Sequence, residues 1–566
     1  MFAYSNKKLQ PTSLIKISRV VCIFILVIPQ FVAIAGDVKF NAGVSAKLVE
    51  QQIKTKDTPM RTIDATNILL TPFASVSYQA KDFDLFFRGT NNQVRRKLDN
   101  ETTTQNFTEY NYAGNYDLFE NVLSLNINGN RSYRSSSQNS FVVDDFLLNS
   151  ESLNKVTSNR AQLRLNVRRG KYYGLSATSF YRITSSDRNE NRVADDSVFD
   201  NENYGVSVNA VTGENLDGAK VSLTSNLQYS ERDSGRDFSS QRLGISSDIE
   251  AYGDFGLALN GTYENNEIKN DSEMVDNRLR EFYTVGAGII WQPRDTRYVR
   301  VLWNRSLSSS IIDGEEDEKD NFLSFNIDWA FSSRTALQAN YTRRFFGDAG
   351  NLSFRHQTKS WRSSVTYSEV VSSTSQFINT NNVGLFICDN GSADLSNCRL
   401  SDSLEPDLEP GQALQPFVVR GLALNDRIIL RKSLTAQTAV TRRRTTFSLT
   451  GSRSQDDEIE INRIFDISTV RANLSFSLSQ RSSIQYGYTF AKTERDQDGV
   501  LESAITKEHN INFRRQVTRR FSASLGLSYL DRNGEVTRGT PSIRGLNGPL
   551  TDRRVTFRIT YDFGSR

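Results

Sequence analysis

The sequence is poor in the residues from which most catalytic and metal centres are built. Its 566 residues include two His, three Cys and ten Pro. So few His and Cys residues leave almost nothing from which to build a His/Cys metal centre, a haem site or a Cys-His nucleophilic pair. The mean hydropathy of −0.49 argues against a helical membrane protein, and no apolar run after residue 35 approaches the length of a membrane helix.

Aromatic residues, in contrast, are abundant for so polar a chain. There are 21 Tyr and 34 Phe, although only 37% of all residues are hydrophobic. Disordered segments are poor in residues that drive burial, so this composition excludes simple disorder. The chain must cover apolar surface in an arrangement that needs few apolar residues.

Residues 1–35 have the pattern of a secretory signal peptide. Four basic residues and no acid lead into an apolar stretch from Val20 to Ala35, which ends in the small-x-small sequence Ala33-Ile34-Ala35. The alternative, a membrane anchor, needs ~20 apolar residues, more than this stretch provides. We therefore expect export, cleavage after Ala35 and a mature chain of residues 36–566.

Cleavage changes the charge and the cysteine content. The leader carries four of the 69 basic residues and no acid, which leaves 65 basic and 65 acidic residues. A chain without net charge is not expected to bind nucleic acid. Cys22 is also lost, and the two remaining residues, Cys388 and Cys398, are expected to form a disulfide in an oxidising compartment, with two free thiols as the alternative.

Strict alternation of apolar and polar residues dominates the mature chain. Every second residue is apolar in Val38–Leu48 and Ala161–Val167, and the same pattern holds in Leu123–Tyr133 apart from Arg131. A period of two places the two sets on opposite faces of a β-strand. The pattern returns in Tyr204–Ala210, Ala219–Tyr229, Phe255–Tyr263, Tyr283–Trp291, Leu323–Phe331, Leu337–Phe345, Ile428–Val440, Val470–Leu478, Ile484–Phe490, Phe521–Tyr529 and Val555–Phe563.

The connections between these segments also alternate. Short turns, such as Lys81-Asp82 and Arg169-Gly170-Lys171, take turns with longer polar stretches, expected at residues 50–66, 135–156, 185–202, 265–277 and 311–321. Short turns at one end and long loops at the other are typical of a bacterial outer-membrane barrel. A soluble β-sandwich or β-solenoid also alternates, but it would show domain linkers or a fixed short repeat, and neither is present.

The alternating segments predict one all-β, transmembrane, antiparallel β-barrel over residues 36–566. Over the whole sequence, including segments not named above, we count 23 strands. Bacterial single-chain barrels have an even number of strands, so we expect about 24, within a range of 22 to 26. The miscounted strand is expected in residues 350–426. Residues 371–426, which contain Cys388 and Cys398, are expected to form a long loop or a plug-like segment.

No catalytic, cofactor-binding or metal-binding residue stands out. His356 and His509 lack a surrounding Ser/His/acid motif, so both are interpreted as polar strand residues rather than catalytic bases. The acidic run Asp313–Asp320 is interpreted as a solvated loop, with divalent-ion bridging at the lipopolysaccharide surface as the alternative. An outer-membrane enzyme therefore rests on no motif, and we expect a non-enzymatic protein.

The polar phase of the strands is expected to line the lumen and to be rich in arginine. Such a lumen favours anionic solutes or an anionic polymer, although these residues could equally pair with acids across strands and stiffen the barrel. The acids on this phase are Asp84, Asp248, Glu250 and Asp328. The candidate lumen residues are Arg88, Arg160, Arg164, Arg168, Arg182, Arg300, Arg344, Arg362, Arg471, Arg554 and Arg558.

Three stretches resemble a family of uncharacterised outer-membrane barrels associated with PEP-CTERM sorting and exopolysaccharide gene clusters. They are Arg427–Leu449, Trp361–Glu369 and Leu70-Thr71-Pro72, the last of which is expected before the second strand. Two features depart from that family's pattern: residues 37–60 lack a Tyr-x-Asp-Asn element, and the chain ends three residues beyond its last aromatic residue, Phe563. The resemblance implies a barrel and a link to exopolysaccharide, but no activity and no functional residue.

Two functional hypotheses follow. The first is a porin-like conduit or accessory for extracellular polysaccharide export or surface anchoring, with the Cys388/Cys398 loop as constriction or lid. The second is a structural or docking protein with a closed lumen, whose loops bind surface polymer or sorted proteins. Either protein would have outer-membrane lipid, lipopolysaccharide and the barrel-insertion machinery as partners, and the first adds exopolysaccharide or its export proteins.

Overall fold

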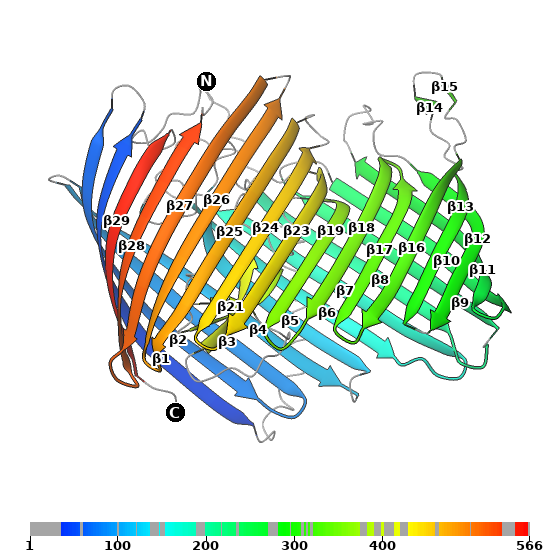
Figure 1. Ribbon diagram of the computed structural model, residues 1–566, viewed down its shortest axis with the longest axis horizontal. Helices are drawn as coiled ribbons and strands as arrows, with labels where there is room; N and C mark the ends of the chain where they lie inside the picture. Colours follow the sequence, from blue (N-terminus) through cyan, green and yellow to red (C-terminus); the bar gives the residue numbers. More distant parts are fainter. Residues whose placement is uncertain are drawn as a thin grey trace, which may run out of the picture.

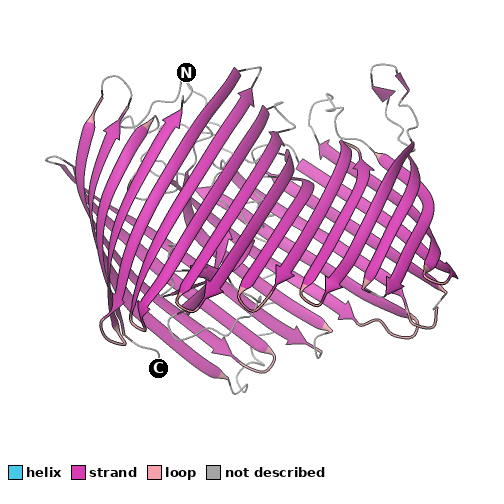
Figure 2. Ribbon diagram, viewed as in Figure 1, coloured by secondary structure: helices cyan, strands magenta, loops and turns pink. Residues whose placement is uncertain are grey.

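The computed structural model describes most of residues 36–566. The described residues are 36–56, 60–98, 101–119, 122–135, 147, 153–187, 199–216, 218–233, 237–269, 281–294, 296–306, 311–312, 315–316, 321–373, 382–389, 398–400, 412–418, 428–458, 463–497, 500–534 and 549–563. The expected signal peptide lies outside them. Within these ranges the regular elements are strands (Figure 2), and no helix is long and apolar enough to cross a membrane.

The main element is a single antiparallel sheet of 24 strands that closes on itself (Figure 1). The first eight are β1 (Asp37–Thr55), β2 (Thr62–Gln79), β3 (Phe83–Leu98), β4 (Glu101–Leu118), β5 (Leu123–Ser135), β6 (Leu153–Val167), β7 (Tyr173–Asp187) and β8 (Phe199–Thr212). The next eight are β9 (Ala219–Arg232), β10 (Asp237–Tyr252), β11 (Phe255–Lys269), β12 (Phe282–Arg294), β13 (Arg297–Ser306), β16 (Asn321–Ser332), β17 (Thr335–Arg344) and β18 (Gly347–Gln357). The last eight are β19 (Trp361–Ser373), β23 (Ile428–Arg442), β24 (Thr445–Glu458), β25 (Arg463–Ser479), β26 (Ser482–Gln497), β27 (Val500–Gln516), β28 (Phe521–Gly534) and β29 (Leu550–Asp562).

Each strand of this ring pairs with the ring strands before and after it in the sequence, and β29 pairs with β1. The closing seam runs from Gly43 opposite Asp562 to Thr55 opposite Leu550. Beyond it, the backbone N–H of Phe563 donates to the carbonyl of Ala42 at 2.8 Å. The expectation of one antiparallel barrel with about 24 strands is therefore confirmed, and the count of 23 segments was one strand short.

The segment expected at residues 371–426 is an insertion between two paired ring strands. β19 runs on to Ser373, where it faces Ile428 of β23, so the insertion begins three residues later than expected. Its described part is a small sheet of β20 (Asn382–Asp389), β21 (Cys398–Leu400) and β22 (Gln412–Val418). Cys388 and Cys398 are direct partners in that sheet; a cross-strand pair has a Cα separation within the range of a disulfide, so the disulfide stays a prediction with a compatible backbone.

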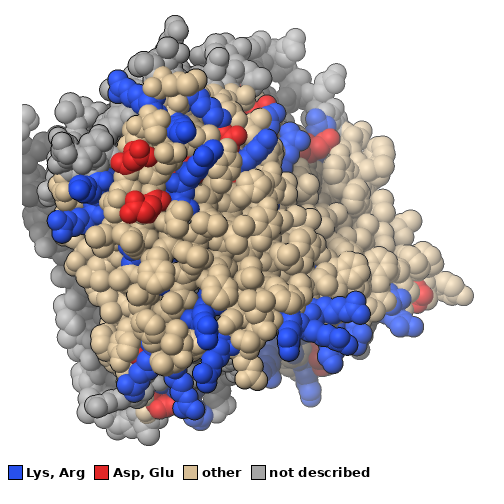
Figure 3. Space-filling view, turned by 60° about the vertical axis from the view of Figure 1, so that its left-hand side comes forward, with Lys and Arg blue, Asp and Glu red and all other residues tan. Residues whose placement is uncertain are grey.

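The outer face carries an uncharged belt. Large apolar side chains are exposed at alternate positions of the strands, among them Phe40, Leu48, Leu257, Ile289 and Val555. The space-filling view shows this belt between an upper and a lower band of charged residues (Figure 3). A closed sheet leaves no unpaired edge, and an apolar outer belt matches a bilayer interior, so the protein is a transmembrane β-barrel.

Aromatic rings lie at both borders of the belt. On the side of the short turns, Phe255 stacks on Trp291 at 6.5 Å between ring centroids. On the other side Tyr204 lies 5.0 Å from Tyr229, and the hydroxyl of Tyr229 donates to Asp237 at 2.9 Å. Amphipathic rings of this kind mark the two membrane interfaces.

The strands continue well beyond the belt at the end opposite the short turns. β1 has 19 residues, whereas ~10 residues cross a bilayer. The long loop expected at residues 50–66 is therefore wrong, because Glu50 still faces Thr66 in the ladder and only residues 56–61 connect β1 to β2. Leu70-Thr71-Pro72, expected before the second strand, lies inside β2; Pro72 has a partner on β1 but none on β3, so its missing N–H falls at a gap in that second ladder.

The ring is sharply bent at β11–β13, at the right-hand end of Figure 1. Cα atoms of β11 and β13 come within 8 Å of each other although β12 lies between them. Two strand spacings in a flat sheet would separate them by about 9.5 Å. Gly286 and Gly288 of β12 form the inside of this corner, and a Cβ atom at Gly288 would lie 1.9 Å from the carbonyl oxygen of Val301.

Candidate functional site: the inner wall of the barrel

The inner wall is the phase of the strands opposite the exposed apolar belt. Two ion pairs identify it independently, because each joins strands that are not neighbours in the ring. Arg300 of β13 pairs with Asp248 of β10, and Arg344 of β17 pairs with Glu264 of β11. Side chains can meet across intervening strands only on the concave side of a curved sheet, so these residues face inward.

The same phase carries all but one of the predicted lumen arginines. Arg168 is the exception: it follows the last residue of β6 and lies exposed in the turn to β7. Arg88 is buried, with its guanidinium 5.3 Å from the ring centroid of Phe73. The remaining predicted residues on this phase are Arg160, Arg164, Arg182, Arg300, Arg344, Arg362, Arg471, Arg554 and Arg558.

The two long-range ion pairs gather at the bent corner of the ring. Nε of Arg344 donates to Glu264 at 3.0 Å, and a second guanidinium nitrogen also bonds this carboxylate. Both pairs are largely shielded from water, with Glu264 only 5% exposed. Bidentate pairs between Arg and a carboxylate fix geometry as well as charge, so this end of the barrel is tied across its interior.

Acidic partners on the inner wall are more numerous than the sequence indicated. Arg431 faces and pairs with Asp456 across β23 and β24. Arg463 of β25 bonds Glu458 of β24 at 2.7 Å. These acids were not predicted from the sequence because the apolar alternation stops before them, although the ladder continues. Glu264 and Asp552 were missed for the same reason.

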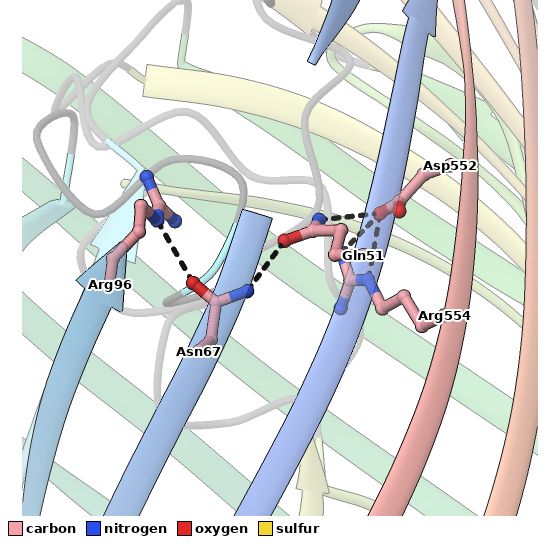
Figure 4. A network of polar contacts seen from close by, with 5 residues as sticks. All are labelled: Gln51, Asn67, Arg96, Asp552 and Arg554. Atoms are coloured by element: carbon pink, nitrogen blue, oxygen red, sulfur yellow. Dashed lines mark hydrogen bonds and ion pairs between the residues drawn. The ribbon is translucent and has the colours of Figure 1, made fainter. Parts of the chain in front are cut away.

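A polar network crosses the seam between the last strand and the first three (Figure 4). Gln51 donates to Asp552 at 3.1 Å and accepts from Asn67 at 3.1 Å, and Nε of Arg96 donates to Asn67 at 3.2 Å. Arg554 adds a bond to Asp552 at 2.7 Å. Four strands, β29, β1, β2 and β3, are joined by side chains in addition to their backbone ladders.

Arg160 and Arg164 differ from these paired residues. Arg160 lies directly opposite Arg182 in the β6–β7 ladder, and Arg164 follows on the same face of β6 four residues further on. Among the described residues neither Arg160 nor Arg164 forms an ion pair, and Nε of Arg160 is buried without a hydrogen-bond partner. Like charges directly opposite each other destabilise a sheet, so this patch favours an anion nearby.

The inner wall is closed off from water in its upper half, at the end opposite the short turns. Val49, Leu69, Val94 and Phe107 form an apolar cluster there, and Leu147 from the connection between β5 and β6 packs against it. Polar inner residues at this level are also buried, such as Asn67 and Asn203 at 0% exposure. Nearer the end with the short turns, inner residues such as Ser353 are exposed.

A second apolar cluster lies on the opposite side of the same level. Phe345 and Phe346, in the turn between β17 and β18, pack against Phe238 of β10 and Val371 of β19. The guanidinium of Arg344 stacks on Phe346 at 4.8 Å. The upper interior is therefore filled at two places by residues of the chain itself, whereas the inner side chains of the lower half are exposed to solvent.

Neither histidine lies on the inner wall. Nδ1 of His356 shares a hydrogen bond with Thr335 at 2.8 Å, and its ring lies 5.2 Å from Trp361. His509 is surrounded by tyrosines, with Tyr488 at 4.8 Å. The part of the chain that the structure describes holds no cluster of three or more metal-ligating side chains. The side chains of the acidic run at 313–320 lie outside the described part.

No family model matches the chain, and no curated protein matches it either. Among solved structures, it is similar to the FrpB iron transporter from Neisseria meningitidis, with 11% identity and a TM-score of 0.44 over 92% of this chain and 82% of that one. The siderophore receptor PirA from Acinetobacter baumannii has 7% identity and a TM-score of 0.36 over 92% and 80%. A mutant ferric enterobactin receptor PfeA from Pseudomonas aeruginosa has 9% identity and a TM-score of 0.38 over 92% and 81%.

Proposed function

We propose that the protein is a non-enzymatic outer-membrane conduit for anionic solutes or an anionic extracellular polysaccharide. The observation that carries this proposal is the Arg160, Arg164 and Arg182 patch. It lies at mid-height on the inner wall. The exposed Arg164 and the half-buried Arg160 form no ion pair in the described part of the chain. Uncompensated positive charge on a pore wall selects anions. The resemblance to exopolysaccharide-linked barrels supports a polysaccharide as the cargo.

The test is the ion selectivity of the refolded protein in a planar lipid bilayer. We expect anion-selective conduction, and we expect Arg160→Gln together with Arg164→Gln to lower the anion-to-cation permeability ratio by roughly twofold or more. Arg453→Gln on the outer face of β24 is the matched control and should leave the ratio unchanged. Cation selectivity in the unmodified protein would refute the proposal.

A second candidate function is favoured by the closed upper interior. If Leu147 and the Phe345–Phe346 turn keep the mouth shut, the barrel acts as a docking protein whose loops hold surface polymer or sorted proteins. The same bilayer measurement separates the two, because a docking barrel gives no conduction. Deletion of residues 535–548, between β28 and β29, should then abolish surface attachment without a change in permeability.

A further inference from the structure

The rim at the end with the short turns carries a run of arginines over three successive turns. We call it the cationic rim. It comprises Arg442 at the end of β23 with Arg443 and Arg444 in the turn to β24, Arg481 in the turn between β25 and β26, and Arg515 near the end of β27 with Arg519 and Arg520 in the turn to β28. All seven are exposed. Successive turns at one end of an antiparallel sheet lie about 10 Å apart, so the residues form one continuous strip.

The cationic rim has no internal neutralisation. Residues 441–445, 479–482 and 515–521 contain no Asp or Glu. Among the described residues, none of these seven arginines forms an ion pair. Figure 3 shows Lys and Arg side chains gathered along the lower edge of the uncharged belt, with few acidic residues beside them.

The strip lies directly below the belt and is directed sideways. Arg442 is two residues beyond Val440, and Arg515 is two residues beyond Phe513; both apolar residues are exposed on the outer face. Residues two apart share a face of a strand and lie about 6.7 Å apart along it. These guanidinium groups therefore begin one step beyond the apolar interior of the bilayer, at the depth of the lipid headgroups.

We propose that the cationic rim binds the phosphate headgroups of anionic phospholipids in the leaflet that faces the short turns. That leaflet is periplasmic in bacterial outer-membrane barrels. Guanidinium groups match phosphate oxygens with two parallel hydrogen bonds, and their stems can lie along apolar surface. The outward direction and the headgroup depth of Arg442 and Arg515 favour a lipid over an acidic periplasmic protein, which would approach the turns from below.

The experiment compares phospholipid binding by the full mature barrel and by variants of the rim. Native mass spectrometry after detergent extraction from vesicles of phosphatidylcholine with phosphatidylglycerol counts the retained lipids. We expect the unmodified barrel to retain phosphatidylglycerol in preference to phosphatidylcholine, and we expect Arg442→Gln, Arg443→Gln and Arg444→Gln together to reduce that retention several-fold. A second variant, Arg481→Gln with Arg519→Gln and Arg520→Gln, should do the same if the first folds poorly.

The control uses basic residues of the same outer face at the opposite rim. Arg453 of β24 is exposed there and Lys492 of β26 is half-buried, and Arg453→Gln with Lys492→Gln should leave the retention unchanged. A salt titration of the thermal unfolding temperature in the same vesicles provides a second readout, because headgroup binding weakens as salt rises. Equal retention by the unmodified barrel and both rim variants would overturn the proposal. An acidic protein would then be the favoured partner of the cationic rim.

Discussion

Single residues decide where the ring can bend. Gly286 and Gly288 face inward on β12, at the corner where β11 and β13 approach each other. A side chain at Gly288 would meet backbone on β13 rather than a flexible side chain, and the wall would have to open to admit it. Ala258, which faces Gly288 across the ladder, is fully buried in the same corner. Small residues are thus a geometric requirement at this place.

Replacement of Gly288 by Val should destabilise the barrel. The new side chain would press on Val301 and Leu302, and overpacking of this kind costs about 1–3 kcal/mol. Urea unfolding of the refolded protein in vesicles, followed by tryptophan fluorescence, measures the difference. Gly451→Ala is the control, because a Cβ atom there meets nothing within 4 Å. An unchanged midpoint for the Val variant would contradict the tight corner.

At the scale of elements, the strands are longer than their apolar pattern. In the lower half the outer phase is apolar and the inner phase polar, whereas above the membrane level the outer phase is polar and the inner phase partly apolar. Gln52 and Asp64, for example, share an exposed hydrogen bond of 3.0 Å on β1 and β2, while Val49 and Ile53 are buried inside. The ladder continues through this change because backbone pairing is indifferent to polarity.

The closing seam should depend on Asp552. Its carboxylate, 1% exposed, accepts hydrogen bonds from Gln51 and Arg554, and loss of its charge removes the ion pair with the half-buried Arg554. Asp552→Asn should lower the free energy of unfolding by on the order of 3 kcal/mol. Asp328→Asn, which removes the charge from an exposed hydrogen bond with Gln338, should change it by less than about 0.5 kcal/mol. Similar losses for both variants would argue against a stabilising seam network.

The molecule as a whole is a barrel whose interior differs between its two ends. The corner at β11–β13 is tied by Arg300–Asp248 and Arg344–Glu264. The upper mouth is filled from opposite sides by Leu147 and by the Phe345–Phe346 turn. Water therefore reaches the inner wall mainly from the end with the short turns. Passage through the lumen requires these apolar contacts to separate.

This asymmetry can be measured by the reactivity of introduced cysteines. In a chain with Cys388 and Cys398 replaced by Ser, we expect Ser353→Cys on the lower inner wall to react rapidly with a water-soluble maleimide. Asn67→Cys, at a position with 0% exposure, should be protected. Equal rates at the two positions would show that the upper interior is open.

The sequence predicts more of the architecture than of the candidate site. Strict alternation is sufficient to predict the barrel and to predict that Arg160 and Arg300 face inward, because a period of two assigns every residue to one face. It does not predict Glu264 or Asp456 as partners, since their strands continue where alternation has ended. Nor does it show that Arg344 meets Glu264, because the two residues are 80 positions apart in the chain.

Sequence alone determined the strand periodicity, the outer apolar belt and the near-absence of catalytic residue types. These features depend on which residues occur and in what order, and on the bilayer that the outer face must contact. Only the tertiary structure decided which arginines are neutralised, where the ring bends and which end of the lumen is filled. Such features arise from contacts between strands that are distant in the ring, and no local pattern encodes the curvature that brings those strands together.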